Sequence, residues 1–482
     1  MQLLKTIVIL GLAIAPLGAS HAQSPTYDIV IAKGRVMDPE SGLDAVRWIG
    51  INGKKIAAIS SSPLTGRDVI EVPGLVVGPG FVDLHAHGQD SISSRLQVRD
   101  GVTTALELEG GTGAVAQWYG ERAGRAVINY GATASHGDAR EAVMKDKVAQ
   151  GPAALYRNAT PQEIEQISEQ IGRQLDQGAL GIGWGLAYTP GTTRGEVIKV
   201  FGLAAKRGVT NFVHHRFASI KEPGSSVEAA EELIAAAAIT GASVHMVHVA
   251  STGLGQVPEI LGMIEGARAH GIDISTEVYP YNAASTDIRA AIFDDGWQDR
   301  LGISYGDIEW VATGERLTAT MFAEKRKQGG MIIAHVIPDA SVNYAVAHPL
   351  VMIASDGVGF VNGRAHPRGA GSYARILGRY VREQKTLTLM EALRKMALMP
   401  ARRLEAVVPQ MKDKGRIRVG ADADLTIFDA ERVIDKATFA EPAQPSAGIV
   451  HVLVNGKVVV RNEKLVDGVT PGEPIRRPVP QP

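Results

Sequence analysis

The sequence of 482 residues contains no cysteine. This absence excludes disulfides, thiolate nucleophiles, cysteine-ligated zinc and iron–sulfur clusters. Any metal ion would therefore be bound by histidine, aspartate, glutamate or a modified lysine, and the 13 histidines are enough for such a site. No GxGxxG motif follows an early strand, so nothing supports a dinucleotide-binding fold.

An excess of one charge is also missing. Lys and Arg total 50 against 51 Asp and Glu, which gives a net charge of −1. Without a global basic field, we expect neither nucleic acid nor an anionic membrane as a partner. Hydrophobic residues make up 45% and charged residues 21% of the chain, the balance of an ordinary globular protein.

The first 22 residues have the pattern of a secretory signal peptide. Lys5 precedes an apolar run of 12 residues at positions 6–17, and small residues lead to Ala22 at the expected cleavage point. The run is too short to span about 30 Å of hydrocarbon, and no cysteine could carry a lipid anchor. We therefore expect cleavage after Ala22, no membrane anchor, and a periplasmic or secreted mature chain.

From about residue 162 onward, helical and strand patterns alternate. The expected strand ends, Trp184, His214, His248 and Tyr279, are separated by 30, 34 and 31 residues. Repeating strand–helix units of this length predict a parallel sheet with helical crossovers. A (β/α)8 barrel of the TIM type and a doubly wound sheet both fit this spacing.

Two β-rich flanks surround the alternating region. Residues 28–77 and 415–466 are rich in Val, Ile and Gly, with turn pairs such as Asn52-Gly53, which predict antiparallel strands. Segments at opposite ends of a chain can pair into one small β-sandwich domain beside a barrel. The expected division is a signal peptide at 1–22, a first part of the β-sandwich domain at 23–82, an α/β barrel at 83–411, and a second β part with a tail at 412–482.

Two histidines follow an apolar strand at the start of the expected barrel. The segment 81–87 (FVDLHAH) places His85 and His87 two positions apart. Residues two apart on a strand point to the same side. Both imidazoles can therefore face the barrel interior and bind one metal ion.

Further polar residues end later apolar strands. His214 and His248 hold equivalent positions where catalytic groups of barrels lie, which predicts a second set of ligands. His215 and His245 are the competing candidates. Asp356 ends another apolar strand, and a carboxylate beside a metal-activated water can act as the general base.

Two glutamates occur in the strand expected around residues 103–109. Glu107 and Glu109 share one face of this strand, opposite Leu106 and Leu108. Glu109 is nearer the C-terminal end, so we expect it to be the metal ligand. Glu107 is expected to support a ligand from behind or to pair with a basic residue.

In this order, the residues resemble the amidohydrolase superfamily of metal-dependent (β/α)8 hydrolases, and within it the N-acyl-D-amino-acid deacylase (D-aminoacylase) family. The resemblance covers about residues 27–460. The strings at 77–83 (VGPGFVD) and 420–425 (GADADL) are similar to those of the whole superfamily. The strings at 185–191 (GLAYTPG) and 366–368 (HPR) are narrower and resemble the deacylase branch.

The resemblance implies a metal centre with one or two zinc ions. Its ligands carry over as His85, His87, His214, His248 and Asp356, with Asp356 also as the base. D-aminoacylases have a metal-binding cysteine after the second strand, where this sequence offers Glu109, a carboxylate able to bridge two ions. The fourth strand, at 179–183, has no lysine for carbamylation, unlike dihydroorotase-like and hydantoinase-like relatives.

The resemblance also implies a small-molecule substrate. Arg368, with Tyr279 and Ser285, is expected to bind the carboxylate of an amino-acid part, and Tyr188 to hydrogen-bond the scissile carbonyl. The implied reaction is hydrolysis of N-acyl-amino acids, in particular N-acyl-D-amino acids, through a metal-activated water. The alternatives are a dipeptidase, a cyclic amide or lactam hydrolase on the same metal centre, and a non-catalytic exported binding protein. The sequence gives no oligomeric state.

One unit of the expected barrel is too long. The seventh strand is expected near Ile332, 53 residues after Tyr279. This gap predicts an insertion of about twenty residues within 284–327. Loops at the C-terminal face of a barrel form the site, so we expect the insertion to lie over the mouth.

Overall fold

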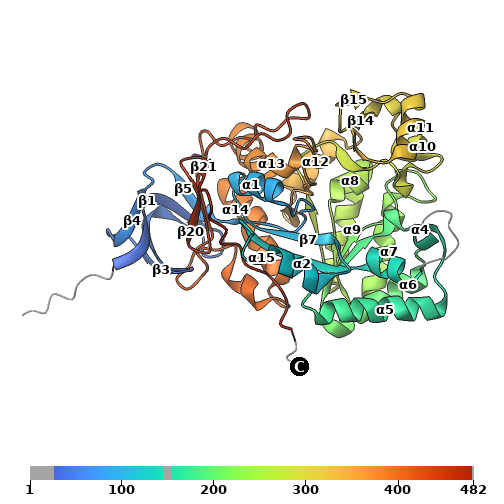
Figure 1. Ribbon diagram of the computed structural model, residues 1–482, viewed down its shortest axis with the longest axis horizontal. Coiled ribbons are helices and arrows are strands. Elements are labelled where there is room, and N and C mark those ends of the chain that lie inside the picture. Colours follow the sequence, from blue (N-terminus) through green and yellow to red (C-terminus); the bar gives the residue numbers. More distant parts are fainter. Residues whose placement is uncertain (1–25, 145–152, 480–482) are drawn as a thin grey trace, which may run out of the picture.

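The computed structural model describes residues 26–144 and 153–479, so the expected signal peptide at 1–22 lies outside the described residues. The chain forms a parallel barrel with helices around it and a separate β-sheet beside it (Figure 1). Within the described ranges, no helix combines the length and apolar character that crossing a membrane requires.

The eight parallel strands confirm the expected (β/α)8 barrel. They lie in the order β17-β12-β11-β10-β9-β8-β7-β6. The ends of this order meet through a bridge between Ala86 and Gly357, where Gly88 N donates to Gly357 O at 2.8 Å. The barrel strands are β6 (Phe81–Asp83), β7 (Val102–Thr112), β8 (Asn129–Ser135), β9 (Gly181–Gly185), β10 (Thr210–His214), β11 (Ser243–Met246), β12 (Ile274–Val278) and β17 (Val351–Ile353).

Helices cover the outside of the barrel, and their sequences explain where they begin. In α5, Thr160 and Glu163 form a reciprocal capping box, and Ile167 and Ile171 on its inner face are buried. The helices are α1 (Ser91–Arg99), α2 (Val115–Arg122), α3 (His136–Val143), α4 (Ala153–Tyr156), α5 (Pro161–Asp176), α6 (Arg194–Arg207), α7 (Ser226–Thr240), α8 (Val249–Gly253), α9 (Val257–Ala269), α12 (Asp339–Ala347), α13 (Arg368–Arg375), α14 (Leu389–Leu393) and α15 (Met399–Leu404). Short 3₁₀ and π-helical segments join them at η1 (Leu186–Tyr188), η2 (Leu254–Gln256), η5 (Ile376–Glu383), η6 (Arg394–Leu398) and η7 (Pro409–Asp413).

The second sheet is built from both ends of the chain, as expected. Its nine strands run in the order β21-β20-β19-β18-β5-β1-β2-β3, with β4 paired to β1. Most pairs are antiparallel, but β1 pairs in parallel with β4 and β5. Figure 1 shows the N-terminal and C-terminal strands side by side. The strands are β1 (Thr26–Asp38), β2 (Leu43–Asn52), β3 (Lys55–Ser60), β4 (Thr65–Glu71), β5 (Val76–Pro79), β18 (Leu425–Phe428), β19 (Ile449–Val454), β20 (Lys457–Arg461) and β21 (Lys464–Leu465).

The expected seventh strand near Ile332 is wrong. That segment is β16 (Met331–Ala334), which pairs antiparallel with β13 and β14 in a separate four-stranded sheet. The seventh barrel strand is β12 and the eighth is β17. A short apolar run is equally suited to any buried strand, so periodicity alone could not tell these two sheets apart.

The insertion is correspondingly larger than about twenty residues, because it extends from β13 to β16. It has its own apolar cluster, in which Phe293, Trp297 and Phe322 pack together. Its elements are β13 (Ala284–Asp287), η3 (Ala291–Phe293), α10 (Trp297–Leu301), η4 (Tyr305–Asp307), β14 (Ile308–Trp310), β15 (Glu315–Arg316), α11 (Ala319–Gln328) and β16.

A buried polar network joins the β-domain to the barrel. Lys414, 3% exposed, donates to Asp424 at 2.7 Å. Asp424 also accepts from Asn129 Nδ2 at 3.0 Å and from the Asn455 backbone at 2.6 Å. Asn129 is the first residue of β8, and Asp424 belongs to the GADADL segment at 420–425. Their hydrogen bond therefore connects the N-terminal end of the barrel to the second sheet.

The network predicts unequal effects of substituting Lys414 and Lys55, which both form an ion pair with Asp422. Lys414→Met should lower the free energy of unfolding by about 3 kcal/mol, because it leaves Asp424 buried without its cation. Lys55 also contacts Asp422, at 2.7 Å, but is 46% exposed, so Lys55→Met should cost less than about 1 kcal/mol. Urea unfolding followed by circular dichroism measures both values. Equal losses in the two variants would contradict this account of the network.

Candidate metal centre and active site

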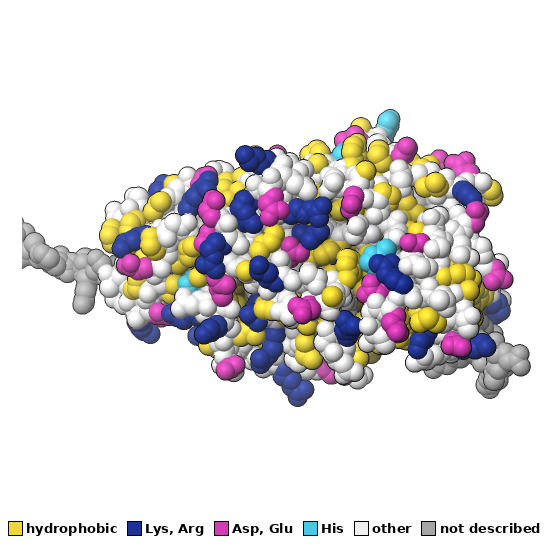
Figure 2. Space-filling view, turned by 90° about the horizontal axis from the view of Figure 1, so that it is seen from above, with side chains coloured by type: hydrophobic (Ala, Val, Ile, Leu, Met, Phe, Trp, Pro, Cys, Tyr) yellow, Lys and Arg dark blue, Asp and Glu magenta, His cyan; other side chains and the backbone are white. Residues whose placement is uncertain are grey.

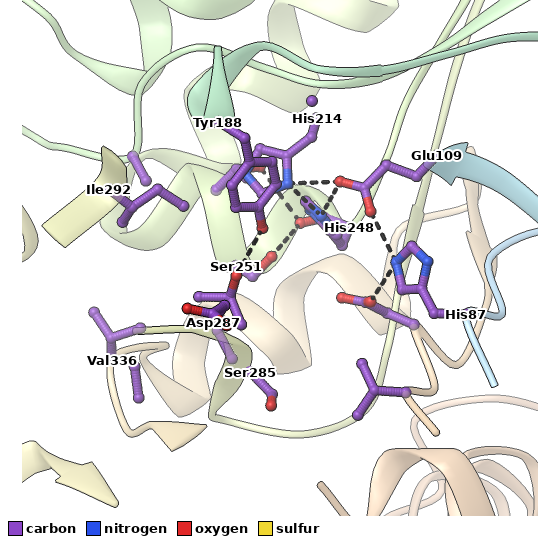
Figure 3. Close-up of a pocket in the computed structure, with 18 of the residues that line it drawn as sticks. His87, Glu109, Tyr188, His214, His248, Ser251, Ser285, Asp287, Ile292 and Val336 are labelled. Carbon is purple, nitrogen blue, oxygen red and sulfur yellow. Dashed lines mark hydrogen bonds and ion pairs between the residues drawn. The ribbon is translucent and has the colours of Figure 1, made fainter. Parts of the chain in front are cut away.

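The six predicted metal ligands lie together at the C-terminal mouth of the barrel. Each belongs to a barrel strand or to the first residues after one, which is where barrel enzymes place their chemistry. The residues are His85, His87, Glu109, His214, His248 and Asp356. Figure 3 shows four of them, His87, Glu109, His214 and His248, pointing toward one another.

The carboxylate of Glu109 lies between two groups of potential ligands. Its Oε2 is 2.9 Å from Nε2 of both His85 and His87. Its Oε1 is 2.7 Å from His214 Nδ1 and 3.5 Å from His248 Nε2. One carboxylate therefore faces two groups of candidate metal ligands, one with each oxygen.

Asp356 completes the first group. Its Oδ1 is 3.4 Å from His85 Nε2 and 3.5 Å from His87 Nε2. Asp356 has a positive φ of 49°, and His248 in the second group has one of 34°. Non-glycine residues adopt this region at a cost and do so mainly at functional sites, so the backbone at both strand ends is held in an unusual shape that aims these side chains inward.

The arrangement fits one or two metal ions. The two Nε2 atoms of His85 and His87 are 3.1 Å apart, and their other ring nitrogens are already bound to carboxylates. A ring whose Nδ1–H is donated to a carboxylate presents a lone pair at Nε2. Two such lone pairs converge with oxygens of Glu109 and Asp356, which is the donor set of a metal site rather than of a hydrogen-bond network.

A second layer of carboxylates fixes the histidine rings. His85 Nδ1 is 2.6 Å from Glu277 Oε1, and His87 Nδ1 is 2.8 Å from Glu107 Oε2. Glu107 also accepts from the Gly110 backbone at 3.1 Å. Glu107 therefore supports His87 from behind, one of the two roles expected for it.

Glu277 and its partner His245 were not identified as a supporting pair from the sequence. Glu277 lies on β12, is 1% exposed, and its second oxygen is 3.0 Å from His245 Nε2. His245 therefore contacts the supporting residue Glu277 and is not one of the candidate metal ligands. A glutamate within an apolar strand is the same signal that identified Glu107 and Glu109, and it could have identified Glu277.

The charges of the site set the pKa values of its members. Burial would raise the pKa of Glu109, but His85, His214 and His248 hold that pKa well below its usual value. Burial would lower the pKa of His87, but Glu107 and Glu109 raise it to about 10. The carboxylates therefore favour positive charge at this position, which a metal ion supplies.

His215, the alternative to His214, lies outside both ligand groups. Burial, together with the neighbouring His214 and His248, lowers the pKa of His215 to about 3. His215 is therefore a neutral, buried residue. The register of β10 places His214, and not His215, toward Glu109.

The four predicted substrate-binding residues line the cavity above the metal ligands. This cavity has a volume of about 370 Å³. Arg368 is buried, with Nη1 2.9 Å from Asp356 Oδ2 and its guanidinium 4.5 Å from the ring centroid of Tyr279. Arg368 Nη2 donates to the backbone oxygen of Ser285 at 3.4 Å. Tyr188 lies over His214, with ring centroids 4.8 Å apart, and Thr286 Oγ1 donates to its hydroxyl at 3.4 Å.

The insertion forms part of the wall of this cavity. Ser285, Asp287 and Ile292 of the insertion, and Val336 just after it, appear at the edge of the pocket in Figure 3. The expectation that the insertion lies over the mouth is therefore confirmed, although its extent was underestimated. Ile292, Phe293 and Leu301 of the insertion give this wall apolar surface.

The Glu109 geometry predicts a difference between the two glutamates of β7. Glu109→Gln should lower kcat/KM at least about a hundredfold, on the order of 3 kcal/mol, and should reduce bound metal, because it removes the charge shared by both ligand groups. Glu107→Gln keeps the first layer intact and should weaken metal binding by about tenfold. Metal analysis after dialysis and steady-state kinetics measure these effects. If Glu107→Gln strips the metal while Glu109→Gln is nearly silent, the assigned roles are reversed.

The chain matches proteins of known activity over most of its length. The family model described as "Amidohydrolase family" matches residues 68–460. An N-acyl-D-glutamate deacylase of Alcaligenes xylosoxydans xylosoxydans is 32% identical, covering 90% of this chain and 93% of that protein. A D-aminoacylase of the same organism is 29% identical, covering 91% and 96%.

Solved structures give the same result. The zinc-containing N-acyl-D-glutamate deacylase of Bordetella bronchiseptica, solved with a phosphonate inhibitor, is 26% identical, with a TM-score of 0.81 over 94% of this chain and all of that one. An L-hydantoinase of Arthrobacter aurescens, 17% identical with a TM-score of 0.63, shares the fold. The protein is a metal-dependent hydrolase of amide C–N bonds. By the extent of the matched segment and the identity to its relatives, the chain belongs to the amidohydrolase family.

Proposed function

We propose that the protein hydrolyses N-acyl-D-amino acids to a carboxylic acid and a free D-amino acid. The observation that carries this proposal is Glu109, with one oxygen toward each histidine group, at the floor of a cavity that also contains the buried Arg368. The names of the relatives, N-acyl-D-glutamate deacylase and D-aminoacylase, support the D-amino-acid class.

Zinc is the proposed ion, held by His85, His87 and Asp356 on one side of Glu109 and by His214 and His248 on the other. The Bordetella relative contains zinc, and imidazole with carboxylate donors suits this ion. When bound, zinc lowers the pKa of water and polarises a carbonyl group. Substrate binding and proton transfer are carried out by side chains of the protein.

In the proposed reaction, Arg368 binds the substrate and Asp356 transfers the proton. Arg368 and Tyr279 bind the α-carboxylate, because a buried guanidinium can donate two parallel hydrogen bonds to it. Asp356 accepts a proton from the attacking water and delivers it to the amide nitrogen as the C–N bond breaks. Its 2.9 Å ion pair with Arg368 orients the carboxylate that carries this proton. Tyr188 donates a hydrogen bond to the scissile carbonyl. Burial and nearby carboxylates raise the pKa of Tyr188, so its hydroxyl keeps the proton that this hydrogen bond requires.

A substrate panel on zinc-loaded protein tests the proposal. N-acetyl-D-leucine should be hydrolysed at least about a hundredfold faster, as kcat/KM, than N-acetyl-L-leucine, because an enantiomer anchored on Arg368 misplaces its amide or its side chain. Asp356→Asn provides the matched control for chemistry without the base. A higher kcat/KM for a dipeptide, a cyclic amide or a lactam would replace this proposal by the corresponding alternative. Metal binding without any turnover would support a non-catalytic binding protein.

We further propose that the chain is exported and functions in the periplasm or outside the cell. The support is the N-terminal pattern of Lys5, the apolar run at 6–17 and small residues before Ala22. N-terminal sequencing of protein recovered from a periplasmic or culture fraction should begin at Gln23. An intact Met1 in cytoplasmic protein alone would contradict export.

A further inference from the structure

A second cavity, also of about 370 Å³, adjoins the substrate pocket, and we call it the outer cavity. Ala218, Ile292 and Leu301 line both cavities, and each keeps part of its surface exposed. A ligand at the candidate metal ligands can therefore extend past these three residues. Figure 3 shows Ile292 on the Tyr188 side of the substrate pocket, with His87 on the opposite side.

The lining of the outer cavity is mainly apolar. The apolar residues that line it and keep exposed surface are Pro190, Phe217, Ala218, Ala291, Ile292 and Leu301. By contrast, Figure 2 shows charged side chains of both signs interspersed over the face that it presents. A hollow with apolar walls beside a reactive centre is typical of a subsite for an apolar part of a ligand.

The outer cavity is also lined by four charged residues, which are Arg194, Arg216, Asp294 and Arg300. The side chain of Arg216 is 5% exposed, and its Nε and Nη2 donate to the two oxygens of Glu232 at 2.8 and 2.7 Å. Arg300 donates to three backbone oxygens of the insertion, and Asp294 forms an ion pair with Arg326. The side chain of Arg194 is 62% exposed, so its charge is hydrated. A ligand in the outer cavity would therefore gain mainly from burial of apolar surface.

The proposed position of the α-carboxylate indicates which part of the substrate lies in the outer cavity. Arg368 contacts Asp356, which follows β17, at 2.9 Å. The outer cavity is lined by residues that follow β9 and β10, within 186–190 and 216–218. In the order of the eight barrel strands, β10 and β9 lie three and four positions from β17, which is the far side of the barrel. With the α-carboxylate on Arg368 and the amide at the candidate metal ligands, the acyl group therefore points toward the outer cavity.

We propose that the outer cavity binds an extended apolar acyl chain of the substrate. This inference rests on the proposed deacylase function and specifies its acyl side, namely N-acyl-D-amino acids derived from straight-chain fatty acids. Burial of each methylene group favours binding. Binding energy from a part of the substrate remote from the amide can also increase the rate at the amide. Hydrolysis with one water molecule would release the fatty acid and the free D-amino acid.

A series of acyl groups on D-alanine tests the proposal. From acetyl through butanoyl and hexanoyl to octanoyl, kcat/KM should rise by at least about thirtyfold, because each buried methylene favours binding about threefold. The isomer of N-octanoyl-D-alanine that carries its methylenes on the other side of the amide, N-acetyl-D-2-aminononanoate, is the matched control. It has the same apolar content, and its kcat/KM should be at least about tenfold below that of N-octanoyl-D-alanine.

Variants then connect the preference to the outer cavity. Ala291 lines the outer cavity and not the substrate pocket. Ala291→Trp fills this space and should lower the octanoyl-to-acetyl ratio of kcat/KM at least about tenfold, a ratio from which any general loss of activity cancels. Ala323→Trp is the control, because Ala323 is exposed in α11 of the same insertion and lines neither cavity. It should leave the ratio unchanged.

A second variant changes the opposite wall of the outer cavity and keeps the test decisive if Ala291→Trp does not fold. Phe217→Asn, in the loop after β10, replaces an apolar lining residue by a polar one. It should lower the octanoyl-to-acetyl ratio about threefold or more.

The outcomes separate this inference from the function on which it rests. Hydrolysis of N-acetyl-D-alanine with an octanoyl-to-acetyl ratio near one or below would overturn the acyl-chain site. Faster hydrolysis of N-acetyl-D-2-aminononanoate than of its isomer would assign the cavity to the amino-acid side chain and overturn the proposal. A ratio that neither Ala291→Trp nor Phe217→Asn lowers would overturn the location. No hydrolysis of any N-acyl-D-amino acid would overturn the proposed function itself.

Discussion

The structure depends on a buried glutamate that has to satisfy histidines on two sides at once. Glu109 is 6% exposed, and its two oxygens lie 2.7–2.9 Å from three different imidazoles. A buried carboxylate is costly unless cations or donors surround it. Without metal ions, some of these histidines have to be protonated, and the carboxylates around His85 and His87 raise the pKa of both against the effect of burial. With metal ions bound, the same charge would face ions held by either histidine group.

The rest of the fold holds this arrangement in place. Parallel strands bring His85, Glu109, His214 and Asp356 to one end of the barrel, although they are far apart in the sequence. Carboxylates behind the site, Glu107 and Glu277, fix the rings that face it. The β-domain anchors the opposite end through Asp424 and Asn129, and the insertion lines part of the mouth. The site is therefore preorganised, which is how enzymes gain electrostatic stabilisation of a transition state.

Much of this could be predicted from the sequence, because the determining signals are local. The spacing of His85 and His87 on a strand makes both side chains point the same way. Glu109 lies two residues nearer the C-terminal end of β7 than Glu107, so it was the better candidate for a metal ligand. The repeating strand–helix units indicated the parallel barrel. The two-ended β-domain, and the grouping of the candidate metal ligands at one end of the barrel, followed from the same patterns and from the resemblance of the motifs to a known family.

The features that were missed depend on contacts distant in sequence. The run around Ile332 is apolar in either sheet, and only its pairing with β13 and β14 shows that it is not a barrel strand. Glu277 carries the same local signal as Glu107 and Glu109, but its role became clear only when His85 and His245 were seen on its two oxygens.

The bridging role of Glu109 is the central claim, and anomalous X-ray scattering at the zinc edge tests it most directly. Crystals of the zinc-loaded wild-type protein should show two anomalous peaks flanking the Glu109 carboxylate, one beside His85, His87 and Asp356 and the other beside His214 and His248. A single peak beside one histidine group would remove the bridge but keep a metal site. Zinc bound elsewhere, with Glu109 hydrogen-bonded only to protonated histidines, would contradict the account.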